Sequence, residues 1–181
     1  QAIAKISQTL NFPVLAEGLS PLRNYSQLNP YLISTYDLIL RNQKLANKLI
    51  PKIVLQIGEL PTSKQLRTWL EAANPQRLII DQSDHNFDPL HGKTTHLRIS
   101  VEQLAKNLIT QYFNNNHDIN YLNLWCQAEE KVRENIDTKM AKINHILEPK
   151  ISWLISQTLP KNTSIFVANS MPVRDVEFFW V

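Results

Sequence analysis

The side chains best suited to bind a ligand lie near the end of the chain, within residues 164–181, SIFVANSMPVRDVEFFWV. Ser170 offers a hydroxyl, and Arg174 offers a guanidinium, which can pair with a carboxylate through two parallel hydrogen bonds. Pro172 between them suits the first turn of a helix, where its missing N–H costs nothing. These residues therefore predict a helix N-terminus that holds an anion such as a carboxylate.

A strand is expected immediately before this helix. The run Ile165–Val167 contains β-branched and aromatic side chains only, which is typical of a buried strand. A strand that leads into a helix N-terminus would bring backbone N–H groups to the anion as well. The alternative is an ordinary connection in which Arg174 pairs with Asp175 or Glu177.

A second candidate is the turn 58–64, GELPTSK, between an apolar run and a capped helix. It resembles a phosphate loop only faintly, because Ser63 stands where that loop needs glycine. The same physics suits a carboxylate better, since helix N–H groups and the Lys64 ammonium would meet at the edge of a sheet. A solvated lysine without a ligand is the alternative.

The heptapeptide Asn169–Asp175, NSMPVRD, resembles a motif of the 2-succinyl-5-enolpyruvyl-6-hydroxy-3-cyclohexene-1-carboxylate synthase (MenD) family. These are thiamine diphosphate (ThDP) transferases of menaquinone and phylloquinone synthesis. The resemblance covers nearly all of the chain, including Phe12–Glu17, Val54–Leu70 and Leu78–Asp81.

The resemblance implies that Ser170 and Arg174 hold the acidic substrates, isochorismate and 2-oxoglutarate. It also implies that Lys64 faces the substrates, whereas Gln65 departs from the arginine of some members. Family members decarboxylate 2-oxoglutarate on ThDP and add the resulting succinyl semialdehyde carbanion to isochorismate.

By the same resemblance, residues 1–117 correspond to the middle domain and residues 118–181 to the truncated start of the pyrophosphate-binding domain. A first residue other than Met and the apolar end Phe178–Val181 also suggest an excised fragment. No Gly-Asp-Gly magnesium motif occurs, so we expect no catalytic, cofactor-binding or metal-binding residue in this chain. The chain alone is expected to be inactive, and the parent to be a cytoplasmic homodimer or homotetramer that needs ThDP and Mg²⁺.

Strands and helices that would position these residues alternate along the chain. Apolar runs predict strands at Pro13–Ala16, Ile53–Ile57, Arg77–Asp81 and His96–Ile99. Helical spacing predicts helices at Gln1–Leu10, Ser63–Ala73 and Ser100–Tyr112, and a helical stretch at Tyr36–Leu49 that is interrupted near Asn42. This order predicts an α/β fold, a doubly wound, mainly parallel Rossmann-like sheet flanked by helices. Residues 120–159 predict a helical C-terminal extension, beyond a domain boundary at Asn114–Asp118.

Composition excludes several classes of protein. The net charge of +3 without a basic block argues against nucleic-acid binding, and no apolar run is long enough to span a membrane. The single Cys126 excludes an internal disulfide and favours a reducing compartment. The chain has three glycines, few for a self-sufficient nucleotide-binding or ThDP enzyme.

Other polar residues have simpler interpretations. The aspartates and histidines of residues 81–91 match no standard metal-ligand spacing and are interpreted as a solvated loop. Arg23, Arg41 and Arg67 are interpreted as surface arginines, with anion contacts as the alternative. Two other functions remain open for the whole chain: a stand-alone Rossmann-like nucleotide-binding module and a regulatory interaction domain.

Overall fold

The computed structural model describes residues 1–110 and 119–180. Its strands are β1 (Val14–Leu15), β2 (Leu32–Ile33), β3 (Ile53–Ile57), β4 (Gln76–Ile80) and β5 (Thr94–Leu97). Its helices are α1 (Ala2–Leu10), the 3-10 helix η1 (Pro21–Leu28), α2 (Tyr36–Leu40), α3 (Gln43–Lys48), α4 (Lys64–Ala73), α5 (Val101–Thr110), α6 (Ile119–Lys142), α7 (Glu148–Thr158) and α8 (Met171–Phe179).

All described strand pairs are parallel. β1 pairs with β2, and β3, β4 and β5 form a second sheet in that order, with Leu55 opposite Leu78. Each of β3 and β4 is followed by a connection that returns to the same end of the sheet, as a parallel sheet requires. The structure thus confirms the predicted α/β fold with parallel strands flanked by helices.

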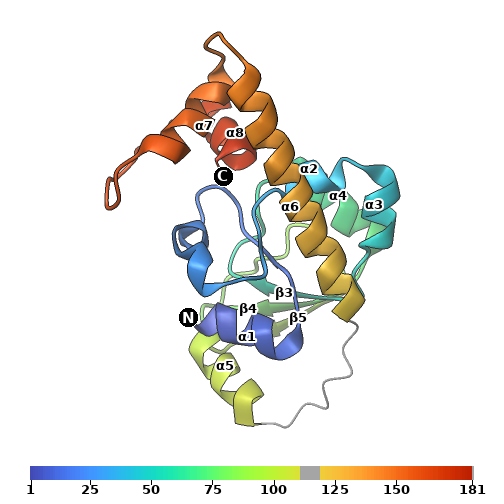
Figure 1. The fold of residues 1–181 in the computed structure, drawn as a ribbon. Coiled ribbons are helices and arrows are strands. Elements are labelled where there is room, and N and C mark those ends of the chain that lie inside the picture. Colours follow the sequence, from blue (N-terminus) through green and yellow to red (C-terminus); the bar gives the residue numbers. More distant parts are fainter. Residues whose placement is uncertain (111–118, 181) are drawn as a thin grey trace.

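Helices cover both faces of β3. Val54 packs against the core built from α2, α3, α4 and α6, whereas Leu55 packs against the core of α1 and α5. This alternation follows from the two-residue period of a strand, which sends successive side chains to opposite faces. Figure 1 shows α1 and α5 together on one side of the strands and α4 and α6 on the other.

The two sheets are not joined into one. A groove of about 640 Å³ lies between them, lined mainly by apolar side chains that include Val14 of β1 and Ile53 of β3. The predicted helix Tyr36–Leu49 is divided into α2 and α3, because Asn42 caps α3 by accepting a hydrogen bond from Leu45 N (3.2 Å).

The predicted strand Ile165–Val167 is wrong. Residues 163–168 are irregular, and the Phe166 side chain is 97% exposed. An apolar run becomes a strand only when a neighbouring strand satisfies its N–H and C=O groups, and no strand in the described ranges lies in register with it. The predicted boundary Asn114–Asp118 falls outside the described residues, as does Tyr112 at the predicted end of α5.

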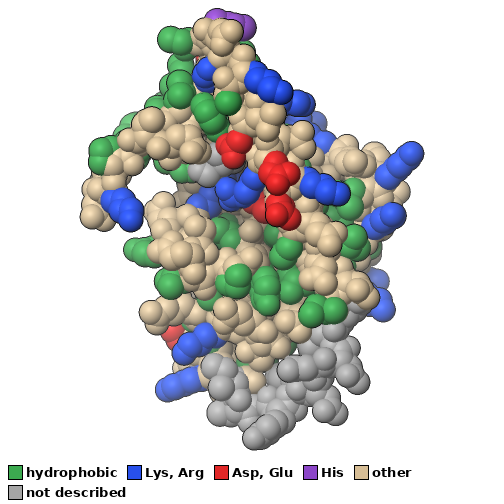
Figure 2. Space-filling model, viewed as in Figure 1, with side chains coloured by type: hydrophobic (Ala, Val, Ile, Leu, Met, Phe, Trp, Pro, Cys, Tyr) green, Lys and Arg blue, Asp and Glu red, His purple; other side chains and the backbone are tan. Residues whose placement is uncertain are grey.

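The three C-terminal helices stand to one side of the sheets. α6 packs against β2 and α2, and α7 packs against α8 (Figure 1). Figure 2 shows hydrophobic side chains exposed around α7, where Ile146, Ile151 and Leu154 are among the exposed apolar residues. Within the described part of the chain, no helix combines the length and the apolar character that crossing a membrane would take.

Candidate functional site

Polar groups gather where β1, β2 and β3 end. Glu17 and Gly18 follow β1, Ser34 and Thr35 follow β2, and the turn 58–63 leads from β3 into α4. The carboxyl ends of parallel strands are the usual place for a ligand in an α/β fold, because helix N-termini open there. α8 contacts this edge through Glu177 near its C-terminal end, and the turn that leads into α4 contacts it through Thr62.

α8 is held at this edge by Glu177. Its carboxylate accepts a hydrogen bond from the backbone N–H of Gly18 and pairs with Arg23, whose Nη2 lies 3.4 Å from Oε2. A side chain at Gly18 would place its Cβ 3.1 Å from the backbone of Glu177, so the close approach of loop and helix needs glycine.

Arg23 is buried within this contact, with 7% of its side chain exposed. Its guanidinium donates to the backbone oxygens of Ala16 (3.0 Å) and Ser34 (2.7 Å), and to that of Glu177 (3.3 Å). The interpretation of Arg23 as a surface arginine is therefore wrong. Because the side chain binds three separate segments, burial can be tolerated although it lowers the pKa of Arg23.

The environment also changes the acidity of its neighbours. Burial raises the pKa of Glu177, and the charge of Arg23 offsets only part of that effect. Burial, followed by the charge of Glu177, raises the pKa of the Tyr36 hydroxyl. Tyr36 therefore stays neutral and contributes no charge to the cluster at neutral pH.

The N-terminal turn of α4 contacts the same loop. The Glu17 carboxylate accepts hydrogen bonds from the backbone N–H (3.1 Å) and hydroxyl (3.3 Å) of Thr62. Ser63 caps α4 by accepting from Leu66 N (3.1 Å), and its hydroxyl donates to Asp37 Oδ2 (2.5 Å). The start of α4 is therefore fixed relative to both β1 and α2.

A second aromatic and ionic contact joins α8 to α2. Asp37 pairs with Arg41 (2.9 Å), and the Arg41 guanidinium lies 5.0 Å from the centre of the Phe178 ring. A cation above an aromatic face is attracted by the ring quadrupole. Arg41 thus supports α8 from a side different from that of Arg23.

Glu129 of α6 binds the turn between β2 and α2. One carboxylate oxygen accepts from Ser34 N (3.0 Å) and Oγ (2.8 Å), and the other accepts from Thr35 N (2.9 Å) and Oγ1 (2.6 Å). Arg133 pairs with the same carboxylate at 2.7 Å and donates to Ser34 Oγ. The carboxylate therefore closes the N-terminus of α2, whose flanking residue is Thr35.

The structure places the three predicted site residues at helix N-termini. Lys64 is the first residue of α4, Ser170 precedes α8, and Arg174 lies in the first turns of α8 with Pro172 at its start. All three side chains are exposed. Among the described residues no hydrogen bond or ion pair joins them to one another, although Glu177 of α8 binds Gly18 and Thr62, just before α4, binds Glu17.

Ser170 has an unusual backbone. Its φ is 75°, a left-handed value that residues other than glycine rarely adopt, and its hydroxyl makes no capping hydrogen bond. Backbone strain of this kind gathers at functional sites, where surrounding structure maintains it. The predicted alternative of an Arg174–Glu177 pair is not what the structure shows, because Glu177 pairs with Arg23.

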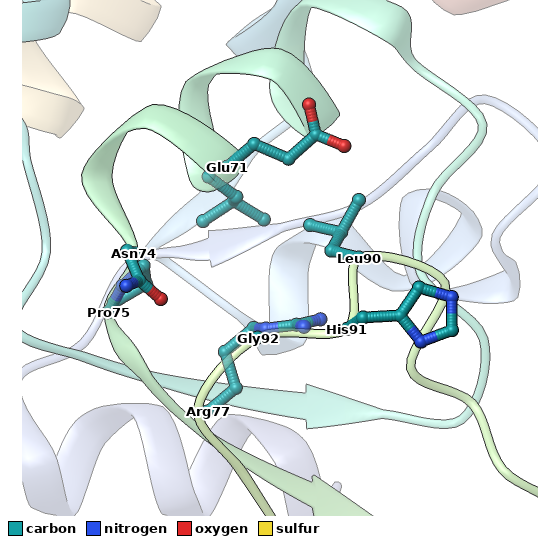
Figure 3. A pocket seen from close by; sticks show the side chains of 8 residues that line it. Glu71, Asn74, Pro75, Arg77, Leu90, His91 and Gly92 are labelled. Atoms are coloured by element: carbon teal, nitrogen blue, oxygen red, sulfur yellow. The ribbon is translucent and has the colours of Figure 1, made fainter.

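A cavity of about 230 Å³ lies near the start of β4, away from this site (Figure 3). Arg77 lines it beside Gly92; its guanidinium pairs with Asp88 and donates to Gln56 Oε1 (3.2 Å). Asp88 also accepts from Gly92 N (3.1 Å) and Thr94 Oγ1 (3.1 Å). This buried pair binds the 88–94 loop to β4.

The interpretation of residues 81–91 as a solvated loop is wrong for Asp88, which is buried. Hydrogen bonds from Ser83 lower the pKa of the half-buried Asp81. In residues 1–110 and 119–180, no group of three or more His, Cys, Asp or Glu side chains could hold a metal ion.

The sequence prediction missed Arg23, Glu129 and Glu177. Glu129 carried a detectable signal, since it lies on the helical face of Leu122, Trp125 and Ile136, which are buried. A glutamate on an apolar stripe requires a partner when it is buried. Arg23 and Glu177 carried no such signal, because they pair with each other across 154 residues of the chain.

Comparison with known proteins agrees with the fold. Residues 1–167 match a family model described as the middle domain of thiamine pyrophosphate, another name for ThDP. The chain is similar to proteins named 2-succinyl-5-enolpyruvyl-6-hydroxy-3-cyclohexene-1-carboxylate synthase, which confirms the resemblance noted from the heptapeptide.

Three of these relatives come from cyanobacterial strains. The protein of Trichodesmium erythraeum is 98% identical over 181 residues, all of this chain and 31% of the relative. That of Gloeothece citriformis is 61% identical over 180 residues (99% of this chain, 31% of the relative), and that of Trichormus variabilis is 60% identical over 180 residues (99% and 30%). The chain thus spans about a third of the length of these relatives. From its parallel α/β fold and the match over residues 1–167, the chain belongs to the thiamine pyrophosphate middle-domain family.

Proposed function

We propose that this chain is part of a ThDP-dependent synthase that joins the succinyl unit of decarboxylated 2-oxoglutarate to isochorismate. The names of the relatives support this proposal. The observation that carries it is structural: Glu177 of α8 and Thr62, two residues before Lys64, both bind the Glu17–Gly18 loop at the carboxyl ends of the strands. We infer that one small acid, held at this edge, bridges Lys64 and Arg174.

Each of the three residues has a role suited to its chemistry. The Arg174 guanidinium pairs with a substrate carboxylate through two hydrogen bonds, which fixes the plane of that group. The Ser170 hydroxyl donates a further hydrogen bond. Lys64 supplies a point charge at the start of α4, where the helix dipole also favours an anion. Isochorismate and 2-oxoglutarate both carry carboxylates, so these contacts would orient substrate without taking part in bond breaking.

The cofactor supplies the decarboxylation chemistry when bound, but the residues of this chain do not suit it. Two of the three glycines, Gly18 and Gly92, are packed against the side chains of Glu177 and Arg77. No candidate metal cluster exists in the described ranges. We therefore assign ThDP and Mg²⁺ to other parts of a cytoplasmic homo-oligomeric parent, and expect the isolated chain to be inactive.

The test is Arg174→Ala in the full-length synthase that contains this chain. A charge-assisted hydrogen bond contributes about 1.5–3 kcal/mol, so kcat/KM for one of the two acids should fall roughly 10- to 150-fold. Lys139→Ala, an exposed cation on α6, is the matched control and should leave kcat/KM unchanged. Unchanged kcat/KM for both acids in Arg174→Ala would refute the assigned role.

The isolated chain offers a second test. Calorimetric titration with ThDP and Mg²⁺ should release no heat of binding, whereas the full-length protein should bind both. Micromolar binding of ThDP and Mg²⁺ to the 181-residue chain would contradict the proposal that other parts of the parent bind them.

A further inference from the structure

We propose that Glu177 and Arg23 are positioning residues, which set the place and rotation of α8 so that Ser170 and Arg174 face the substrate. This inference rests on the proposed function. Glu177 touches no substrate in this scheme; it acts through the helix that carries the binding residues.

Glu177 lies three residues after Arg174 and seven after Ser170. At about 100° per residue, three residues bring Arg174 within about 60° of Glu177 around the helix. Ser170 directly precedes Met171, the first residue of α8, so its backbone moves with the helix. Fixing the Glu177 carboxylate therefore fixes the direction in which both binding residues point. The rise of about 1.5 Å per residue also sets their distance from the Gly18 loop.

Arg23 is a rigid support for that carboxylate. Its guanidinium is held by the carbonyl oxygens of Ala16 and Ser34, which follow β1 and β2. It also donates to the backbone oxygen of Glu177, so both the main chain and the side chain of α8 are bound. A planar guanidinium with several fixed acceptors has little freedom to follow a displaced helix.

The loop held by Glu177 also holds α4. Gly18 binds Glu177, and the preceding residue, Glu17, binds the turn before Lys64 through Thr62. The two helices that carry the proposed binding residues are thus connected by two adjacent residues. Loss of the Glu177 contact should change the spacing between Arg174 and Lys64, and with it the fit of a dicarboxylate. A misplacement of about 1 Å is enough to weaken a two-point contact strongly.

The other charged groups around this pair do not replace it. Glu17, Glu129 and Arg133 influence Arg23 or Glu177 electrostatically, but Glu129 and Arg133 bind Ser34 and Thr35 instead. Tyr36 is neutral. Arg23 is therefore the cation that faces the Glu177 carboxylate in the described part of the chain.

The experiment is Glu177→Gln in the full-length synthase, with steady-state kinetics for both acids. The substitution keeps the size of the side chain and removes its charge. We expect KM for at least one acid to rise about tenfold, the equivalent of about 1.4 kcal/mol, while kcat changes less than about twofold. A role in folding alone would lower the active fraction, and therefore kcat, without changing KM.

Two further variants complete the test. Arg23→Gln should raise the same KM, and the double variant Arg23→Gln/Glu177→Gln should raise it no further than the larger single effect, because the residues act as one unit. Glu134→Gln, an exposed glutamate on α6, is the matched control. If Arg23→Gln does not fold, Glu177→Gln alone decides.

A KM within about twofold of wild type in Glu177→Gln, or a fully additive double variant, would overturn this inference. A wild-type protein without synthase activity would instead refute the proposed function. The two failures are therefore distinguishable.

Discussion

Replacement of Glu129 by glutamine should separate α6 from the β2–α2 turn. The amide nitrogen cannot accept a hydrogen bond, so the bond from Thr35 N would be lost, its N–H would face an N–H donor, and Arg133 would lose its ionic partner. Removing one partner of a buried charged network costs about 3–5 kcal/mol. Arg133 is 33% exposed, so water would hydrate it partly and the lower end, about 3 kcal/mol, is expected.

The same variant should change how stability depends on pH. Burial alone would raise the pKa of Glu129, but hydrogen bonds from Thr35 and the charge of Arg133 together hold it below its usual 4.5. The folded state therefore binds this proton less readily than the unfolded state. The stabilisation is complete above about pH 4.5 and is lost as the pH falls through the folded pKa.

Urea denaturation of the 181-residue chain, followed by tryptophan fluorescence, would measure both effects. At about pH 7, Glu129→Gln should lower the free energy of unfolding by about 3 kcal/mol and the Tm by roughly 6–12 °C. The difference from wild type should shrink below about pH 4. Glu134→Gln, on the exposed face of the same helix, is the control. A loss under about 1 kcal/mol, or a difference independent of pH, would refute the reasoning.

Three further substitutions test the packing and the backbone. Trp125→Ala should lower the free energy of unfolding, measured with denaturant, by about 3–5 kcal/mol, because the ring is buried and lies edge-on to Trp69, with 6.1 Å between the ring centres. A smaller loss would mean that the surrounding side chains move into the space left by the ring. Asp175→Asn should raise the Tm at neutral pH by about 1–3 °C, because burial and, second, the charge of Glu148 raise the pKa of Asp175. The gain in Tm should vanish as the pH falls below about 3.8, and a lower Tm at neutral pH would contradict this reasoning. Gly58→Ala should lower the free energy of unfolding by about 1 kcal/mol, because the φ of Gly58 is 65°, a value that strains an alanine. Nothing lies within 4 Å of an added Cβ, so backbone strain is the whole effect, and an unchanged midpoint of unfolding would contradict it.

Local patterns predicted those parts of the fold that depend on local physics. The apolar run Ile53–Ile57 is β3 as predicted, and the capped helix after Ser63 is α4. Strand ends shifted slightly: β4 begins one residue before the predicted Arg77, and β5 begins two residues before the predicted His96. Hydrogen-bond pairing with a neighbour decides such ends, and single-chain patterns carry no information on it.

The site was predicted less completely than the fold. Ser170 and Arg174 were recognised from a heptapeptide, and their helix begins where Pro172 indicated. Ile165–Val167 was assigned as a strand from hydrophobicity alone, although pairing with a second strand is what would make it one. Arg23 was assigned to the surface because arginine usually lies there, and its burial depends on acceptors from three segments of the chain.

The contact between Gly18 and Glu177 spans 159 residues and therefore governs the order of folding during synthesis. The first parallel pair can form while the ribosome is still elongating, but Arg23 meets its carboxylate only after a further 154 residues have emerged. Closing so long a loop costs little more than closing a shorter one, about 0.6 kcal/mol per doubling of length, so the delay is kinetic. A nascent chain stalled before residue 177 should expose Arg23 to solvent and be cleaved by trypsin there, and protection should appear once α8 has left the exit tunnel.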